Sequence, residues 1–306
     1  MSPSRAHAVE AGSFVGLGGR GRRLVGDLVA LTKPKVQSLL LLTTLTAMYA
    51  AGRPSAGLVV ATLVGGALSA GGASAFNHWY DRDIDALMPR TTDRPLPSGR
   101  MAPHVALWVA LWLSIASVLV LGLAVNWVAA GLSVAGLAWY CGVYTMWLKR
   151  RTTQNIVIGG AAGAFPPMVG WAAVTGEVTW TSVAMFAIVF AWTAPHFWAL
   201  ALLIQDDYAA ARVPMLPVVR GEAVTHRAIV NWSAVTVAVS LAPALIGTMG
   251  PLYIAVALIL GVELLRRSVL LRQRADRPAA VALHLYALAY LAVLFLAMVV
   301  DHQLGL

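Results

Sequence analysis

Hydrophobic and polar positions alternate along this chain in long blocks, not at the short periods of a soluble helix or strand. Apolar runs of roughly 20 residues, the length that a helix needs to cross a bilayer, recur throughout the chain. These runs lie at 34–52, 57–77, 103–124, 127–147, 155–175, 179–203, 228–248, 250–270 and 281–300. Asn126-Trp127 and Gly250-Pro251 separate runs that would otherwise merge. The pattern predicts an all-α integral membrane protein with nine transmembrane helices.

Composition supports this class and divides the chain. Of the 306 residues, 59% are hydrophobic and only 11% are charged, whereas a soluble domain carries about 25% charged residues. The first 33 residues are polar and contain no apolar segment followed by a small-residue cleavage site, so we expect no secretory signal. We predict a flexible, basic, cytoplasmic segment over residues 1–30 and a single transmembrane domain over residues 31–306.

The distribution of basic residues predicts the orientation of the helices. With the N-terminus in the cytoplasm and nine spans, 21 of the 22 Lys and Arg residues lie on the cytoplasmic side and only Arg53 lies outside. This distribution obeys the positive-inside rule, and it places the C-terminus outside. The net charge of +9 is therefore a topology signal, and nucleic-acid binding is not expected. We predict a multi-pass protein of the plasma membrane.

Acidic residues gather on the same side. Only Glu177 and Asp301 fall outside in this topology, although the positive-inside rule makes no such demand on acidic residues. Acids concentrated beside bases indicate a functional site on the cytoplasmic side.

The most polar stretch of the chain runs from Asn77 to Arg90. If the preceding helix continues to Leu87, Asn77, Asp81 and Asp85 share one face at spacings of i, i+4 and i+8, and Asp83 points elsewhere. Like charges at this spacing repel, so we expect a counter-ion. Mg²⁺ takes one or two carboxylates and completes its shell with water and phosphate oxygens. The alternative is a solvated acidic helix end.

Basic residues follow this acidic stretch. Arg90, Arg94 and Arg100 either pair with the carboxylates or bind the outer oxygens of a phosphate. Lys149 and Arg150 belong to a basic triplet after Tyr144, and such a triplet is either an orientation signal or a phosphate site.

A second pair of acids follows the apolar run at 179–203. Asp206 and Asp207 are adjacent there, and two acidic helix ends that face each other across a central cavity can clamp a diphosphate through two metal ions. His196 lies about three turns earlier, inside the apolar run, and is either a packing residue or a substrate contact.

The spacing Asn77-x₃-Asp81-x₃-Asp85 resembles the first aspartate-rich motif of the UbiA superfamily of intramembrane prenyltransferases. From about residue 30 to the C-terminus the chain resembles the heme-prenylating branch of that superfamily. The segments that carry this narrower resemblance are Leu31–Val36, Asp83–Thr91, Leu148–Thr152, Asn155–Pro167, Pro195–Trp198 and Pro214–Val218. The second motif of the superfamily is commonly Asp-x₃-Asp, whereas Leu203 stands four residues before Asp207 here. This departure also resembles the heme branch, with Asp207 as the main acid.

The resemblance implies a transferase of the EC 2.5.1 class. It implies transfer of a farnesyl group from farnesyl diphosphate to a vinyl group of heme B, which gives heme O and diphosphate. The implied catalytic residues, which are also the implied Mg²⁺ ligands, are Asn77, Asp81, Asp85 and Asp207. The implied substrate contacts are Arg90, Arg94, Lys149, Arg150, Tyr144, His196 and Asp206. Heme B is then a substrate, and the implied partners are the lipid bilayer and downstream heme-modifying or terminal-oxidase assembly proteins.

Two other functions remain open on the sequence. One is a UbiA-type prenyltransferase with an aromatic acceptor such as a quinone precursor. The other is a transporter that uses the cytoplasmic acids as an ion path, although the outer halves of the predicted spans lack polar residues.

Overall fold

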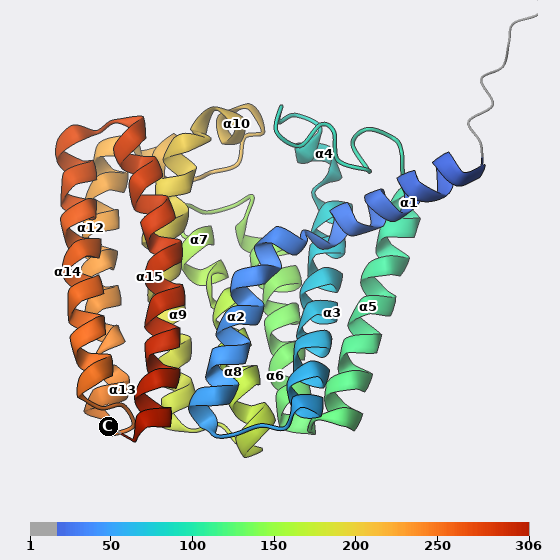
Figure 1. Cartoon of the computed structure of the whole chain (residues 1–306). Helices are drawn as coiled ribbons and strands as arrows, with labels where there is room; N and C mark the ends of the chain where they lie inside the picture. The colour runs from blue at the N-terminus through green and yellow to red at the C-terminus, as the bar shows by residue number, and fades with distance from the viewer. Residues whose placement is uncertain (1–16, 306) are drawn as a thin grey trace, which may run out of the picture.

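The computed structural model describes residues 17–305 and is a bundle of long helices, with several of the short helices at its upper end (Figure 1). The first half of the bundle contains α2 (Pro34–Ala51), α3 (Ala56–Tyr80), α5 (Pro103–Ala124) and α6 (Trp127–Ala138), which the π-helix η1 (Trp139–Leu148) extends. The second half contains α8 (Ala161–Thr175), α9 (Trp180–Leu203), α12 (Glu222–Ser240), α14 (Pro251–Arg274) and α15 (Arg277–Leu304). The short helices at the upper end include α4 (Arg82–Asp85), α10 (Gln205–Ala210) and α11 (Leu216–Arg220).

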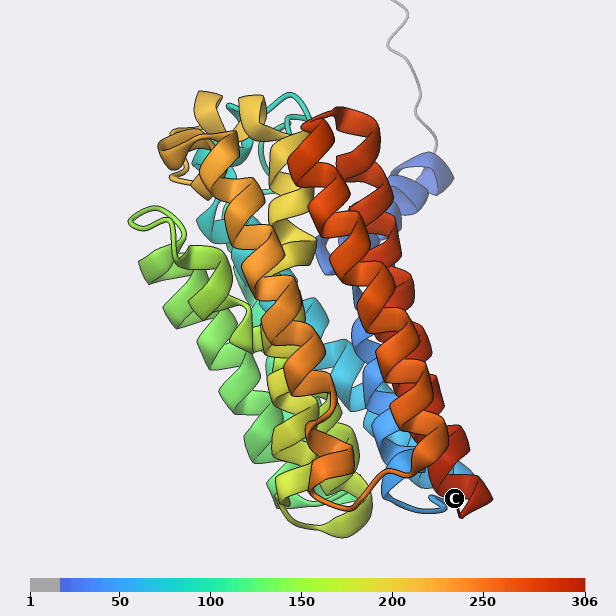
Figure 2. The same ribbon diagram turned by 90° about the vertical axis from the view of Figure 1, so that its left-hand side faces the viewer.

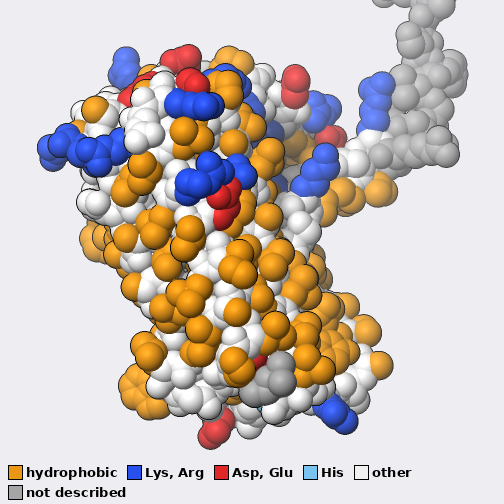
Figure 3. All heavy atoms as spheres, turned by 60° about the vertical axis from the view of Figure 1, so that its left-hand side comes forward, with side chains coloured by type: hydrophobic (Ala, Val, Ile, Leu, Met, Phe, Trp, Pro, Cys, Tyr) orange, Lys and Arg blue, Asp and Glu red, His pale blue; other side chains and the backbone are white. Residues whose placement is uncertain are grey.

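Seven helices in the described part of the chain are long and apolar enough to cross a membrane. They are Ala56–Tyr80, Pro103–Ala124, Trp127–Leu148, Asn155–Thr175, Trp180–Leu203, Glu222–Leu245 and Arg277–Leu304. This confirms an all-helical, multi-pass membrane protein. The face in Figure 3 is broadly apolar, and most of the charged side chains on it lie toward the upper end.

The two other predicted spans correspond to α2 and α14, which lie in the same bundle (Figures 1 and 2). Neither is among the seven apolar helices. α2 carries Lys35, Gln37 and several threonines, and α14 carries three charged residues near its middle, Glu263, Arg266 and Arg267. Both helices therefore lie where spans were predicted, but they are less apolar than the other seven.

Several predicted helices are interrupted. The helix expected to continue to Leu87 ends at Tyr80, and α4 follows after Asp81, which has φ −89° and ψ 7°. The run at 155–175 divides into α7 (Asn155–Gly159) and α8. A Cβ atom at Gly159 would lie 2.3 Å from Cδ2 of Tyr144, so glycine permits the close approach of α7 and η1. The run at 228–248 likewise divides into α12 and α13 (Ala242–Leu245).

The N-terminal prediction is tested only in part. Residues 1–16 of the segment expected to be flexible lie outside the described residues, and Leu17–Thr32 form helix α1. The end of α1 is anchored, because Leu31 is fully buried in a cluster with Ala75, Leu96 and Met101. Lys33 then takes a left-handed conformation (φ 49°), and Pro34 begins α2. This bend places the side chain of Lys33 at the upper end of α3.

The main core lies among α9, α12, α14 and α15. Tyr253, Tyr290 and Phe295 are completely buried there, and Ser240 hydrogen-bonds both tyrosine hydroxyl groups. At the lower end of the bundle, the carboxylate of Asp301 accepts hydrogen bonds from the backbone N–H groups of Gly250 and Tyr253. Asp301, one of the two acids predicted outside, therefore caps the start of α14.

Candidate active site

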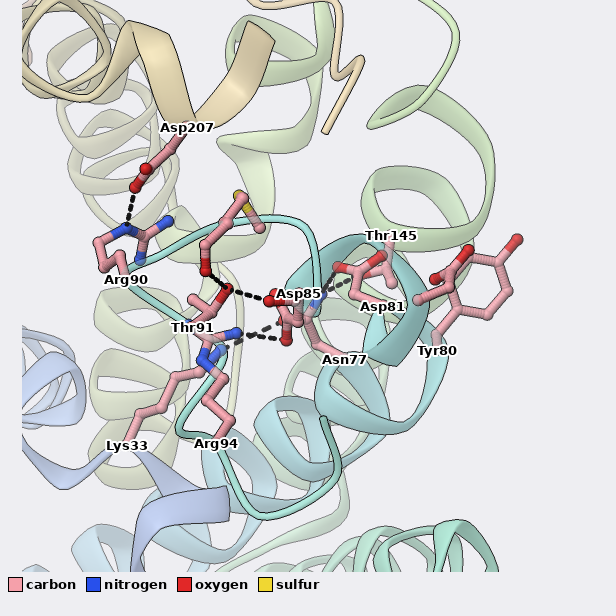
Figure 4. Close-up of polar contacts among 12 residues, drawn as sticks. Lys33, Asn77, Tyr80, Asp81, Asp85, Arg90, Thr91, Arg94, Thr145 and Asp207 are labelled. Carbon is pink, nitrogen blue, oxygen red and sulfur yellow. Dashed lines mark hydrogen bonds and ion pairs between the residues drawn. The ribbon is translucent and has the colours of Figure 1, made fainter. Parts of the chain in front are cut away.

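The upper end of α3 presents the amide and the carboxylate that the sequence predicts on one face (Figure 4). Nδ2 of Asn77 donates to Oδ2 of Asp81 at 2.6 Å and to Oγ1 of Thr145 on η1 at 3.3 Å. Asp81 is completely buried, and Asp85 is 1% exposed. A solvated acidic helix end is therefore wrong for these two carboxylates.

Each buried carboxylate holds a basic partner. The ammonium group of Lys149 contacts Oδ2 of Asp81, and Nη1 of Arg94 lies 2.6 Å from Oδ2 of Asp85. The hydroxyl group of Thr91 donates to the backbone carbonyl of Asp85 at 2.7 Å, which fixes the loop after α4. Because a charge removed from water is costly unless it is paired, these contacts explain how the carboxylates remain buried.

Arg150 connects the buried acids to the surface. Its Nη2 atom lies 3.2 Å from Oδ1 of Asp81, and its two terminal nitrogens each lie 2.7 Å from an oxygen of Asp83. The bidentate contact holds the pKa of the Asp83 carboxyl below its usual range and raises the pKa of Arg150. Asp83 points away from the Asn77 face, as the sequence predicts, because it faces Arg150.

Lys33 is a site residue that the sequence did not identify. Its Nζ atom donates to Oδ1 of Asn77 at 3.2 Å, and this contact joins residues 44 positions apart. Burial, and then the positive charges of Arg94 and Lys149, lower the pKa of Lys33 to about 7. Positive charge is thus crowded around the acids, which is the electrostatic environment that an anion favours. The signals in the sequence were its place beside Pro34 at the start of a predicted span and within Leu31–Val36, one of the segments that carry the family resemblance.

The second acidic segment reaches the first through the loop after α4. Nε of Arg90 lies 3.3 Å from Oδ2 of Asp207 on α10. The structure thus brings the two predicted acidic helix ends together, with Arg90 between them (Figure 4). Burial raises the pKa of the neighbouring Tyr208.

Three other predicted substrate contacts lie in different surroundings. Tyr144 packs against Tyr140 with ring centroids 5.4 Å apart, and its ring lies against Gly159. His196 is stacked between Trp192 and His284, at centroid distances of 4.4 and 4.5 Å, where α9 meets α15. Asp206 is exposed and lines a separate polar cavity with Glu222 and His226. Within residues 17–305, none of the contacts of His196 or Asp206 involves Asp81, Asp85 or their basic partners.

The donor atoms suit a hard cation that is shared with a ligand. In the described part of the chain, no three His, Cys, Asp or Glu side chains form a complete metal centre. The oxygens of Asn77, Asp81 and Asp85 nevertheless already accept hydrogen bonds from positively charged groups. Mg²⁺ prefers such oxygens and fills its remaining positions with water and phosphate oxygens. The residues therefore fit Mg²⁺ that is bound together with a phosphate ligand.

The fold and the charge cluster define a multi-pass helical membrane protein with buried ionisable groups at one end of its bundle. The chain belongs to the UbiA prenyltransferase family, whose model matches residues 40–299.

Relatives with about half of their residues identical carry one name. A protein from Symbiobacterium thermophilum named protoheme IX farnesyltransferase is 52% identical over 283 residues, which cover 91% of this chain and 95% of the relative. A protein from Chloroflexus aurantiacus with the same name is 51% identical over 92% of this chain and 48% of its own length. The chain thus spans about half the length of some curated relatives that it matches and nearly all of others.

Solved structures share the fold at low sequence identity. A structure of digeranylgeranylglyceryl phosphate synthase superposes with a TM-score of 0.75 at 15% identity, over 92% of this chain and 99% of that one. A UbiA homologue from Archaeoglobus fulgidus, bound to DMAPP and Mg²⁺, superposes with a TM-score of 0.67 at 17% identity, over 89% and 99% of the two chains. At these identities the likeness establishes the fold.

Proposed function

We propose that this protein transfers a farnesyl group from farnesyl diphosphate to a vinyl group of heme B, which gives heme O and diphosphate. The observation that carries the diphosphate half is the buried cluster in which Asp81 and Asp85 each hold a basic partner. The acceptor and the chain length of the donor follow from the relatives named protoheme IX farnesyltransferase, including one that matches over almost its full length.

The proposed ligands for Mg²⁺ are one amide and three carboxylates near the end of α3, in α4 and in α10. They are Asn77, Asp81, Asp85 and Asp207. Bound Mg²⁺ supplies positive charge to the diphosphate as the allylic C–O bond breaks. Where a metal ion neutralised the carboxylates, Lys149 and Arg94 would be free to pair with diphosphate oxygens in place of Asp81 and Asp85. The Mg²⁺-bound homologue from Archaeoglobus fulgidus supports this assignment through its shared fold.

The basic side chains around the acids stabilise the leaving diphosphate. Arg90, Arg94, Lys149 and Arg150 approach it from the loop after α4 and from the end of η1, and Lys33 approaches from the bend before α2. Positive groups fixed before the reaction stabilise the charge that develops when the bond breaks. The vinyl group attacks the farnesyl cation, and water adds to the cation that results. Tyr144 forms part of the wall that keeps other water out of this space.

We place the site on the cytoplasmic side of the plasma membrane. In this topology α2 and α14 complete nine spans, the N-terminus is cytoplasmic, the C-terminus is outside, and residues 31–306 form one domain. The proposal is supported by the 21 basic residues on one side and by the charged upper end in Figure 3. Enzymes that modify heme O, or that insert it into a terminal oxidase, are the partners expected for this product.

A reconstitution assay tests the function. Purified protein in lipid nanodiscs, supplied with farnesyl diphosphate, heme B and Mg²⁺, is expected to form heme O and diphosphate in equal amounts, measured by chromatography with mass detection. Prenylation of a quinone precursor in place of heme would transfer the assignment to an aromatic acceptor. Solute flux in proteoliposomes without diphosphate release would contradict any transferase.

A further inference from the structure

Two polar side chains on α3 lie beside the acid cluster and have no hydrogen-bond partner among the described residues. They are Ser74, which is 7% exposed, and His78, which is 2% exposed. The Oγ atom of Ser74 and both ring nitrogens of His78 are buried and unpaired. Leaving a buried polar atom without a partner is costly, so three such atoms in neighbouring turns indicate a ligand with hydrogen-bonding atoms of its own.

Helix geometry places this pair on the site face of α3. Ser74 and His78 are separated by four residues, and His78 and Asp81 are separated by three, so each pair consists of neighbours on the helix surface. At 1.5 Å per residue, His78 lies about 4.5 Å and Ser74 about 10 Å further into the bundle than Asp81. The pair therefore begins next to the proposed diphosphate site and extends deeper into the bundle.

The chemistry of the pair suits a single water molecule. A buried water needs two to four polar partners. A neutral imidazole offers one donor and one acceptor, and a serine hydroxyl offers both functions.

We propose that Ser74 and His78 hold the water molecule that completes the reaction. This inference rests on the proposed function, which requires water after the farnesyl group has joined the vinyl group. The water oxygen forms a C–O bond to the carbocation at the former vinyl carbon. The proton that it loses passes to an oxygen of the departing diphosphate. Heme B, farnesyl diphosphate and water thus give heme O and diphosphate with all atoms accounted for.

The ratio of two products tests this role. Without a held water, the carbocation loses a proton and gives an alkene that is lighter than heme O by one water. In Ser74→Ala and in His78→Leu, the ratio of hydroxylated product to alkene is expected to fall at least about tenfold, while diphosphate release continues. Ser114→Ala is the matched control, because the hydroxyl group of Ser114 donates to the carbonyl of Ala110 within α5.

The possible outcomes separate this inference from the proposed function. A wild-type protein that releases no diphosphate with heme present contradicts the proposed function itself. Folded variants that keep the wild-type product ratio, at any rate of turnover, overturn the water site alone. Loss of diphosphate release in both folded variants assigns the residues to ionisation and also overturns it. If His78→Leu does not fold, the ratio in Ser74→Ala decides, because that change removes a single atom.

Discussion

Arg90 on the loop after α4 contacts Asp207 on α10, with 3.3 Å between Nε and Oδ2, and so joins segments 117 residues apart. The side chains are 43% and 18% exposed, and a pair of this kind contributes about 1 kcal/mol or less to stability. The contact therefore matters through position, because it holds the two acidic helix ends at one site.

Replacing Arg90 with glutamine separates these two roles. We expect Arg90→Gln to raise the KM for farnesyl diphosphate at least about tenfold, because a positive charge is lost near the leaving group, while the melting temperature changes little. Steady-state kinetics and a thermal melt in detergent provide the measurements. Arg100→Gln is the control, since Arg100 is also 43% exposed and pairs with Asp27 at 3.1 Å. Equal kinetic losses in both variants would contradict a diphosphate role for Arg90.

The carboxylates of α3 and α4 are expected to be indispensable for turnover. Asp81→Asn or Asp85→Asn removes a proposed metal ligand but retains an oxygen that accepts from the basic partner, so we expect at least a hundredfold loss of kcat in a protein that remains folded. Heme O formation and circular dichroism together provide the test. Asp27→Asn, at a half-buried acid outside the cluster, serves as the reference. Substantial activity in either variant would exclude the metal role of that residue.

The basic triplet provides a matched pair two residues apart. Lys149 is 9% exposed and contacts Asp81, whereas Arg151 is exposed. We expect Lys149→Ala to lose most activity and some stability, because it leaves Asp81 with only Arg150 as a charged partner. Arg151→Ala should remain within about twofold of wild type in kcat/KM. A larger loss of activity in Arg151→Ala than in Lys149→Ala would contradict the assignment of Lys149 to the site.

The packing of α2 on α8 depends on one glycine. A Cβ atom at Gly170 would lie 2.2 Å from the backbone carbonyl oxygen of Thr44, a contact that no side-chain rotation relieves. We expect Gly170→Ala to lower the melting temperature by at least several degrees. Gly163→Ala on the same helix meets nothing within 4 Å and should be neutral or slightly stabilising, since alanine favours helices by about 1 kcal/mol over glycine. Equal melting temperatures would contradict the close approach.

Metal removal should stop catalysis without unfolding the protein. Since no group of three or more His, Cys, Asp or Glu side chains forms a metal centre in residues 17–305, a metal ion that is bound with diphosphate contributes little to the fold. Activity should vanish in a chelator and return on addition of Mg²⁺, with an unchanged melting temperature in the absence of substrate. Full activity in the chelator would require the basic side chains alone to support ionisation.

The sequence predicts much of the fold because each transmembrane helix is determined by one contiguous apolar segment between polar ends. It also predicts the shared face of Asn77 and Asp81, which depends only on helical spacing. Lys33 was missed because its role depends on a left-handed bend and on a partner 44 residues away. The cavity that Asp206 lines with Glu222 and His226 was equally hidden, because it depends on how α10 packs near the start of α12. Long-range contacts of this kind leave little trace in one sequence.

In the proposed site, the metal ion and the diphosphate are coupled ligands, because Asp81 and Asp85 already pair with Lys149 and Arg94. A cation that arrives alone must displace Lys149 and Arg94 and leave them unpaired, whereas the diphosphate offers both side chains a new anion. Each ligand therefore raises the affinity for the other by the same factor, as thermodynamic linkage requires. The protein is thus expected to bind free Mg²⁺ weakly and to take up the metal–diphosphate complex as a unit.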